Sequence, residues 1–320
     1  MTEPGSKPNI CAVFLFNHRY EKNIPVLEEI YAARFSNRHY IMPFSRVAAP
    51  NISSVFEAGR NFSGHLAQAS RDFIRPEYTH YVVVADDLLL NPALDESNLL
   101  DALGLAADQG YIKDLTAADA LRMTWPWASE AAMAFRRGKA GLDVAALLPD
   151  PAEAKAKLEA MGIRFPDPGP GGMVQTWRWY QAVGKRARAS FLMGLGMRGQ
   201  PSDYPFVSGY SDFLVIPAGA MQDFVRYAGA LAALNIFAEI AVPTALALAC
   251  QSVRTELALN SHFAAASPAH SSSGLRGVEI WDRLDMERYG ALFDGTLPEV
   301  LDRFPADWLY VHPVKLSRYA

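Results

Sequence analysis

The chain has 320 residues, of which half are apolar and 20% are charged, and its formal net charge at pH 7 is −4. This length and apolar content suffice to bury a sizeable core in one large domain or two smaller ones. The small net charge argues against a nucleic-acid-binding protein, which would carry a strongly basic domain. The two cysteines, Cys11 and Cys250, lie inside apolar runs and are expected to be buried thiols in a reducing compartment.

Two segments bear on location. Residues Met1–Asn9 are polar and contain no apolar stretch of the kind that a secretory signal needs, so the cytoplasm is expected. The run Ala228–Cys250 is long enough for a membrane span, but Glu239 lies near its middle and Pro243 interrupts it. A central carboxylate costs about 2.5–3.5 kcal/mol on insertion scales. We therefore expect two buried helices that meet near Pro243.

The first part of the chain alternates between two kinds of apolar pattern. Ile10–Phe16 is an almost unbroken apolar run, which predicts a strand covered on both faces. After it the pattern predicts a helix over Ile24–Phe35, a strand over Arg38–Phe44, a helix over about Ile52–Phe73 and a strand over Tyr78–Ala85. Such alternation favours an α/β layer with a mixed, mostly parallel sheet flanked by helices.

The middle of the chain has a different sequence pattern. Leu99–Gly110 and Ala152–Met161 have helical character, Phe165–Gly172 is a Pro/Gly linker, and Gln175–Met197 predicts an aromatic and basic helix. We therefore divide the chain into an α/β half at 1–103, a helical insertion at 104–200 and a second half at 201–320. In that second half we expect a strand over Phe206–Ile216, helices from Ala218 to about Asn260, a polar loop over Ser261–Gly274 and a last strand over Trp308–His312.

The strongest local signal for chemistry is the pair Asp86-Asp87, which follows the apolar strand and precedes Leu-Leu-Leu-Asn-Pro. Ligands of open α/β sheets bind at the carboxyl ends of the strands. Carboxylates there can hold Mg²⁺ or Mn²⁺, and the metal can bridge phosphate oxygens. An acidic strand end that leads into an Asn-Pro turn is the structural alternative.

The segment around Asp86-Asp87 resembles the DxD region of GT-A glycosyltransferases. The strand that ends in Asn17-His18-Arg19 and the segment Gly209–Phe213 are also similar to segments of that family. The resemblance implies a GT-A-like, Rossmann-like fold and sugar transfer from a nucleotide-diphosphate donor. It further implies that Asp87 holds the metal, while Asn17, Arg19 and Asp86 contact the nucleotide. Ala85 stands where a strict motif has its first acid, so the roles of the two carboxylates stay open.

The tail of the chain adds a second part of the resemblance. His312 ends the last predicted strand and Lys315 follows it shortly. Many GT-A enzymes supply a C-terminal histidine to the metal and a nearby lysine to the diphosphate, so the resemblance implies these roles for His312 and Lys315. Imidazole suits Mn²⁺, and an ammonium offsets charge on a departing diphosphate. Solvated residues at an ordinary chain end are the alternative.

Asp212 and Glu239 are the candidates for the acceptor side. Both acids lie in apolar surroundings, where a carboxylate needs a partner or a function. An inverting transferase needs a base for the acceptor hydroxyl. For Glu239, pairing with Arg226 or Arg254 is the structural alternative. Arg60 is a further residue that could touch the nucleotide.

The expected partners are a nucleotide sugar, most simply a UDP-sugar, and a glycan or lipid-linked acceptor. Trp177, Trp179 and Tyr180 could stack on a sugar or pack in the core. Together with Lys185, Arg186 and Arg188, their segment could alternatively lie on the inner face of a membrane. Two other functions remain open, a sugar-phosphate nucleotidyltransferase and a non-catalytic nucleotide-sugar-binding protein. A nucleotidyltransferase would normally have a Gly-rich loop after its first strand, and none follows Phe16.

Overall fold

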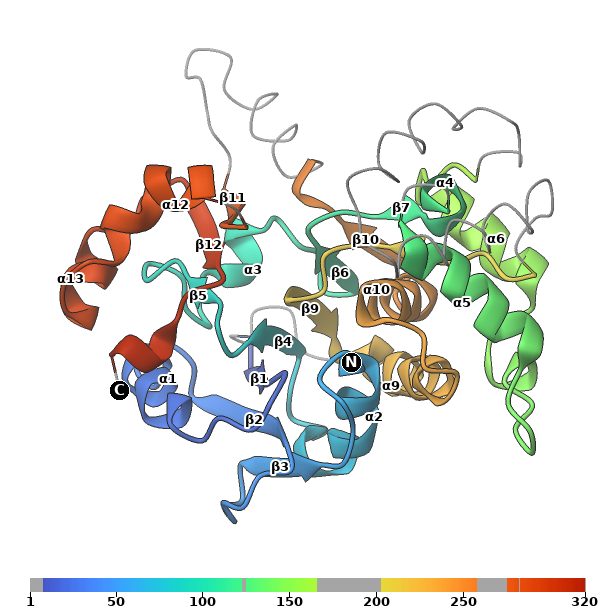
Figure 1. Cartoon of the computed structure of the whole chain (residues 1–320), viewed down its shortest axis with the longest axis horizontal. Helices are drawn as coiled ribbons and strands as arrows, with labels where there is room; N and C mark the ends of the chain where they lie inside the picture. The colour runs from blue at the N-terminus through green and yellow to red at the C-terminus, as the bar shows by residue number, and fades with distance from the viewer. Residues whose placement is uncertain (1–7, 123–124, 166–202, 258–274, 282, 320) are drawn as a thin grey trace.

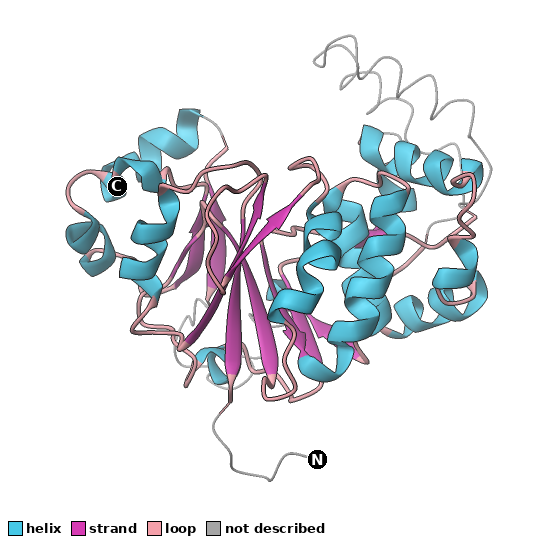
Figure 2. Cartoon of the chain, turned by 90° about the horizontal axis from the view of Figure 1, so that it is seen from below, coloured by secondary structure: helices cyan, strands magenta, loops and turns pink. Residues whose placement is uncertain are grey.

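The computed structural model describes residues 8–122, 125–165, 203–257, 275–281 and 283–319. A seven-stranded main sheet has helices on both faces (Figures 1 and 2). In spatial order its strands are β10 (Ser252–Arg254), β6 (Gln109–Ile112), β9 (Phe213–Pro217), β4 (His80–Ala85), β1 (Ile10–Leu15), β2 (Asn37–Pro43) and β3 (Ile52–Val55). The pairings β1–β2, β1–β4, β2–β3 and β6–β10 are parallel, whereas β9 runs antiparallel to β4 and β6. The predicted α/β fold with a mixed, mostly parallel sheet is confirmed.

The central strand β1 is buried on both faces, as its unbroken apolar run predicts. Successive side chains point to opposite faces of a strand, so Cys11, Val13 and Leu15 enter one core and Ala12 and Phe14 enter the other. Burying a large apolar side chain stabilises the fold by roughly 1.5–3 kcal/mol. The apolar run therefore fixes β1 at the centre of the sheet. Both cysteines are buried free thiols, as expected.

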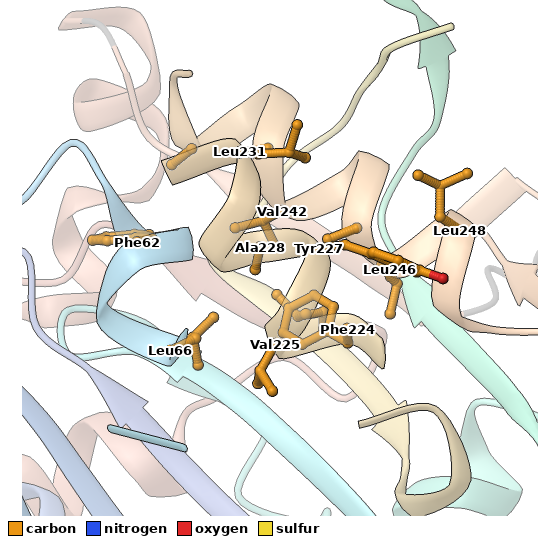
Figure 3. Close-up of a cluster of buried hydrophobic side chains, with 14 of the residues drawn as sticks. Phe62, Leu66, Phe224, Val225, Tyr227, Ala228, Leu231, Val242, Leu246 and Leu248 are labelled. Atoms are coloured by element: carbon orange, nitrogen blue, oxygen red, sulfur yellow. The ribbon is translucent and has the colours of Figure 1, made fainter. Parts of the chain in front are cut away.

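Three helices cover the first face of the sheet: α2 (Phe62–Phe73), α9 (Ala218–Ala233) and α10 (Ala238–Ala249). Figure 3 shows Phe62 and Leu66 from α2 beside Phe224 from α9 and Val242 from α10. Each of these side chains is almost fully buried. The start of α10 is joined to the segment before α2, because the Ala238 N–H donates to the Arg60 carbonyl at 3.3 Å, and both segments contribute to the site described below.

A helix and a small sheet cover the second face. The helix is α1 (Asn23–Tyr31), and the small sheet consists of β11 (Arg276–Glu279), β12 (Trp308–His312) and β5 (Leu89–Leu90). β12 lies in the middle, parallel to β11 and antiparallel to β5. Because β5 follows Asp86-Asp87 directly, this pairing brings the last strand of the chain to the acidic pair.

Short elements complete the described fold. Beside β12 lie α12 (Arg283–Tyr289), η2 (Gly290–Phe293), α13 (Leu297–Asp302) and η3 (Leu316–Arg318). The others are α3 (Leu99–Ala102), α4 (Ala118–Leu121), α5 (Pro126–Arg137), η1 (Ala145–Leu147), α6 (Pro151–Ala160) and the paired strands β7 (Thr116–Ala117) and β8 (Val207–Ser208). The predicted helix at 152–161 is confirmed, and it begins after Asp150, whose carboxylate accepts the Ala152 N–H at 2.8 Å.

Two predicted helices are wrong over part of their length. Residues Ile52–Val55 form edge strand β3 beside β2, and α2 begins only at Phe62. Burial alternates along this strand, with Ser53 and Val55 buried and Ser54 exposed, but the residues Ile-Ser-Ser-Val do not themselves alternate between apolar and polar, so they carry no period of two. In Leu99–Gly110 the helix ends by Gly104, which adopts a φ of 60°. Residues 109–112 then form β6 of the main sheet, so the described part of the range 104–200 contains a sheet strand as well as helices.

The predicted break near Pro243 is also wrong. The chain turns between α9 and α10 at 234–237, where Asn235 adopts a φ of 56°, and Pro243 lies inside α10. Proline has no N–H for the carbonyl four residues before it, which belongs to Glu239. That carbonyl instead accepts the Gly209 N–H at 3.1 Å. The proline therefore frees a backbone group that ties α10 to the segment before β9.

Among the described helices, none combines the length and the apolar character that a membrane crossing requires. The predicted helix at Gln175–Met197 and the loop at Ser261–Gly274 lie outside the described residues, as does nearly all of the Pro/Gly linker. The same holds for the aromatic and basic residues of the sugar-stacking and membrane hypotheses.

Candidate functional site

The candidate site lies where β1 and β4 end. The chain leaves β1 for β2 and β3 on one side and returns to β4 on the other, and ligands of open sheets bind at such a reversal. The Asp86 N–H donates to the Leu15 carbonyl at 3.0 Å, which joins the two strand ends. The Ala85 N–H donates to the Asp212 carbonyl at 2.8 Å. Asp212, one residue before antiparallel β9, therefore reaches the same edge.

A cavity of about 420 Å³ opens at this edge. Its lining comes from the loop after β1, the start of α2, the end of β4, the segment before β9, the first turn of α10 and the ends of β11 and β12. The polar and charged lining residues are Asn17, Arg60, Asp87, Ser211, Asp212, Glu239 and His312. Phe62, Phe237 and Trp281 supply its aromatic surface. Segments that are far apart in sequence thus converge on one space.

Asp87 and His312 face each other across the junction of the two sheets. The His312 Nε2 atom lies 3.1 Å from the Asp87 Oδ1 atom. The backbone supports this approach, because the Val314 N–H donates to the Asp87 carbonyl at 2.6 Å. The two residues that the resemblance implies for one metal therefore lie side by side, and their binding of a metal stays a prediction.

The other face of His312 is held by Tyr210. The Tyr210 hydroxyl is hydrogen-bonded to His312 Nδ1 at 2.6 Å, and the Tyr210 ring stacks on Tyr310 with centroids 5.8 Å apart. Burial disfavours the imidazolium, but the hydrogen bond to Asp87 and the charge of Asp212 outweigh it and raise the pKa of His312. The imidazole is thus fixed at both ring nitrogens.

Asp86 differs from its neighbour because its side chain is buried. Its Oδ2 atom accepts a hydrogen bond of 2.8 Å from the Asn23 amide in α1. Burial, followed by the charge of Asp87, raises the pKa of Asp86 to about 7. Asp86 is not among the residues that line the cavity. The contact predicted between Asp86 and a nucleotide stays a prediction.

Asp212 and Glu239 both line the cavity, and among the described residues neither forms an ion pair with a lysine or an arginine. Arg226 pairs with Asp223 at 3.0 Å, and Arg254 donates to the Gly104 carbonyl. Burial is the main cause that raises the pKa of Asp212 to about 6. Burial, followed by the charges of Asp212 and Glu279, raises the pKa of Glu239 to about 7. Two acids in a cavity whose pKa values lie near neutral pH can exchange protons with a ligand.

Asp87 and His312 bring two possible metal-ligating side chains to the cavity. Among the described residues there is no group of three or more His, Cys, Asp or Glu side chains able to hold a metal ion. Asp87 and His312 supply one carboxylate oxygen and one imidazole nitrogen to the same space, and this pair suits Mn²⁺. Mg²⁺ sites commonly use one or two carboxylates and complete the shell with phosphate oxygens and water. The residues therefore fit a metal that arrives with a phosphate ligand.

Of the other residues predicted to contact the nucleotide, some line the cavity and others do not. Asn17 lines the cavity, whereas Arg19 is exposed and lies 3.7 Å from Glu21. Lys315 is exposed just beyond Val314 and does not line the cavity. Arg60 lines the cavity, and its guanidinium lies 5.3 Å from the ring centroid of Trp127.

Several residues of the site escaped prediction from sequence. Tyr210, Glu279 and Trp281 touch or adjoin His312. Glu279 and Trp281 come from a segment with no motif, and Tyr210 was not singled out within Gly209–Phe213. Gly59 is another, because a Cβ atom at this position would lie 1.8 Å from the Asn17 carbonyl oxygen. Only glycine allows the loops before α2 and after β1 to approach so closely. A Gly before an Arg-Asn pair is a weak signal, so the sequence could not have singled it out.

Comparisons of the chain with models of known protein families, with curated proteins and with solved structures found no match.

Proposed function

We propose that the chain is a metal-dependent glycosyltransferase with a GT-A-like fold, which transfers a sugar from a nucleotide-diphosphate donor to a glycan or lipid-linked acceptor. UDP is the expected nucleotide. The observation that carries the proposal is the convergence of Asp87 and His312, 3.1 Å apart, on a cavity that also contains two acids with raised pKa values. The resemblance of the sequence around Asp86-Asp87 to the DxD region supports the same conclusion.

On the donor side, Asp87 and His312 would hold Mn²⁺ or Mg²⁺. A bound metal would supply positive charge to the diphosphate oxygens, which gain negative charge as the sugar departs. Asn17 lies at the reversal of strand order where nucleotides bind in open sheets, and it lines the same cavity. The nucleotide would therefore lie over the end of β1 and its diphosphate toward β12.

On the acceptor side, Asp212 or Glu239 would accept the proton of the acceptor hydroxyl. The oxygen of that hydroxyl forms a bond to the anomeric carbon while the bond from that carbon to the diphosphate oxygen breaks. A base works best when its pKa lies near the working pH, and pKa values of about 6 and about 7 meet that condition. This assignment describes an inverting reaction, which the replacement of each acid tests.

A first experiment measures release of UDP from UDP-glucose, UDP-galactose, UDP-N-acetylglucosamine and UDP-glucuronate without acceptor. A transferase releases nucleotide slowly by transferring the sugar to water, whereas a binding protein does not. We expect release from at least one donor with Mn²⁺ and none with EDTA. Asp87→Asn should abolish it, while Asp307→Asn, which removes a half-buried acid outside the cavity paired with Arg276 at 3.4 Å, should not. Equal rates in the two variants would refute the proposed site.

A second experiment separates the two acids. Replacing the true base by its amide should lower transfer by about 10²–10⁴ while leaving the affinity for UDP unchanged. Asp212→Asn and Glu239→Gln are compared under identical conditions, with a panel of saccharide acceptors. If both variants transfer sugar at the parent rate, neither acid is the base and a retaining reaction is favoured.

A further inference from the structure

We infer that Trp281 forms a sugar-binding platform at the mouth of the cavity, which would take the apolar face of a pyranose ring of the acceptor. This inference rests on the proposed function. It concerns a residue that carries no sequence motif and that follows β11 directly. The residue is 62% exposed, although it lines the cavity.

The indole of Trp281 is held in place. Its Nε1–H donates to Glu279 Oε2 at 2.7 Å, and Glu279 forms an ion pair with Lys113. The indole and the imidazole of His312 meet at 72°, with ring centroids 5.4 Å apart. A ring that is already fixed loses little entropy when a ligand binds, which is the advantage of preorganisation.

A chain of contacts also connects Lys113, the ion-pair partner of Glu279, back to Trp281. Lys113 lies 5.3 Å from the centroid of Tyr210, and Tyr210 is hydrogen-bonded to His312. His312 in turn contacts Trp281. The position of the indole is therefore linked to the imidazole that the proposed function assigns to the metal. A ring stacked on Trp281 would lie beside the reacting centre.

One face of the indole is available to a ligand. The perpendicular contact with His312 occupies at most one face, and the large exposed fraction leaves the other in contact with solvent. Phe237, another aromatic residue of the lining, differs in this respect because it stacks on Trp127 at 21° with centroids 4.7 Å apart. Exposed aromatic surface beside a polar cavity is typical of a binding site.

The charges of the cavity favour a neutral, hydroxyl-rich ligand at this platform. Asp87, Asp212 and Glu239 line the same space, and carboxylates accept hydrogen bonds from hydroxyl groups. The three acids outnumber the Arg60 guanidinium in the lining, so they would repel a phosphate that arrived without a metal. A sugar ring combines hydroxyl groups at its edge with an apolar C–H face, so it matches both the acids and the indole.

The test measures binding of four probes, the methyl glycosides of glucose, galactose, mannose and N-acetylglucosamine. Saturation-transfer NMR is carried out on the full chain with UDP and Mg²⁺ present, and UDP affinity is measured separately by calorimetry. The variants are Trp281→Ala, Trp281→Phe, which keeps an aromatic face, and Met286→Ala as a control. Met286 is 53% exposed on neighbouring α12 and does not line the cavity.

We expect at least one glycoside to bind the parent chain, with about tenfold weaker binding to Trp281→Ala and much smaller losses in the other two variants. UDP affinity should be the same in all four proteins. The inference is overturned if no glycoside binds, if Trp281→Ala binds glycosides as the parent does, or if this variant loses UDP instead. Glycoside binding that depends on Trp281 in a chain without UDP affinity would support the platform and refute the proposed function.

Discussion

The carboxylate of Asp87 and the imidazole of His312 lie 3.1 Å apart although 225 positions separate them in the chain. The small sheet explains how this happens, because β5 follows Asp87 and pairs with β12, whose last residue is His312. The Tyr210 hydroxyl then fixes the far nitrogen of the ring at 2.6 Å. If Nε2 ligates a metal, Nδ1 carries the proton and donates a hydrogen bond to the Tyr210 oxygen. Such a contact outside the metal's own ligands orients the His312 imidazole.

This pair leads to the first prediction, that UDP binds only together with a divalent cation. Two protein donors hold a metal weakly, so the diphosphate must complete its shell. Calorimetry should therefore show UDP binding with Mn²⁺ or Mg²⁺ and at least tenfold weaker binding with EDTA. His312→Ala should reduce this difference. Equal affinity with metal and with EDTA would contradict a metal bridge between the nucleotide and the protein.

The second prediction concerns stability and pH. Folding raises the pKa of Glu239 from 4.5 to about 7, through burial and through the charges of Asp212, Glu279 and Asp114, which outweigh the opposing effect of His312. The stability associated with the protonated acid is fully present below about pH 4.5 and is lost as pH rises through 7. Glu239→Gln should therefore stabilise the chain at pH 8 by on the order of 2 kcal/mol and have little effect at pH 4.

Urea unfolding of both proteins at the two pH values measures this difference. Asp223→Asn is the control, since Asp223 is exposed and pairs with Arg226 at 3.0 Å. This control should change little at either pH, because exposed ion pairs contribute at most about 1 kcal/mol. A Glu239→Gln variant that is less stable than the parent at pH 8 would show that the carboxylate has a stabilising partner in the fold.

A third prediction concerns the close approach of the backbone at Gly209. A Cβ atom at this position would lie 2.2 Å from the Asp114 carbonyl oxygen, so Gly209→Ala must displace the backbone of Asp114, whose side-chain Oδ1 accepts the Tyr210 N–H at 3.0 Å. We expect a loss of about 1–3 kcal/mol in the free energy of unfolding. Gly219→Ala in α9 is the matched control, because its Cβ would have no neighbour within 4 Å. It should be neutral or stabilising by up to about 1 kcal/mol. Equal effects of the two changes in urea unfolding would refute the steric argument.

The sequence predicted those parts of the fold in which the pattern is long and local. The buried strand β1 was predicted from its apolar run, and the acidic pair was predicted to lie where β4 ends. The alternation of strand and helix patterns predicted a mostly parallel sheet. The errors arose where a tertiary partner decides the structure. Ile52–Val55 becomes a strand only because β2 lies beside it, and Pro243 is tolerated in α10 because the Gly209 N–H takes the carbonyl that it leaves free.

In the site, too, the residues with a local sequence signal could be predicted, and those that depend on tertiary contacts could not. Asp87 and His312 could be singled out because each ends an apolar strand, and Asp212 and Glu239 because acids in apolar runs need a reason. Tyr210 and Trp281 could not, since their importance comes from contacts with His312 that form only once the small sheet packs on the main one. Arg60 had no local signal beyond its charge, whereas its place in the lining depends on the loop that Gly59 allows.

The last prediction assigns Lys315 to turnover more than to binding. This lysine is exposed at the start of η3, and the backbone immediately before it is bound to Asp87 through the Val314 N–H. Its ammonium is therefore tethered near the acidic pair without lining the cavity, so a long flexible side chain could reach a diphosphate beside the metal. Charge grows on the leaving diphosphate in the transition state, and a cation there lowers the barrier more than it aids binding of the donor.

Lys315→Ala should lower kcat about tenfold or more and change the affinity for UDP and metal by less than about threefold. Arg318→Ala is the matched control, because this exposed cation in the same tail lies 3.7 Å from Asp294 and should leave both quantities unchanged. Steady-state kinetics and calorimetry on the two variants provide the comparison, and a Lys315→Ala protein with parental kcat would exclude the lysine from the reaction.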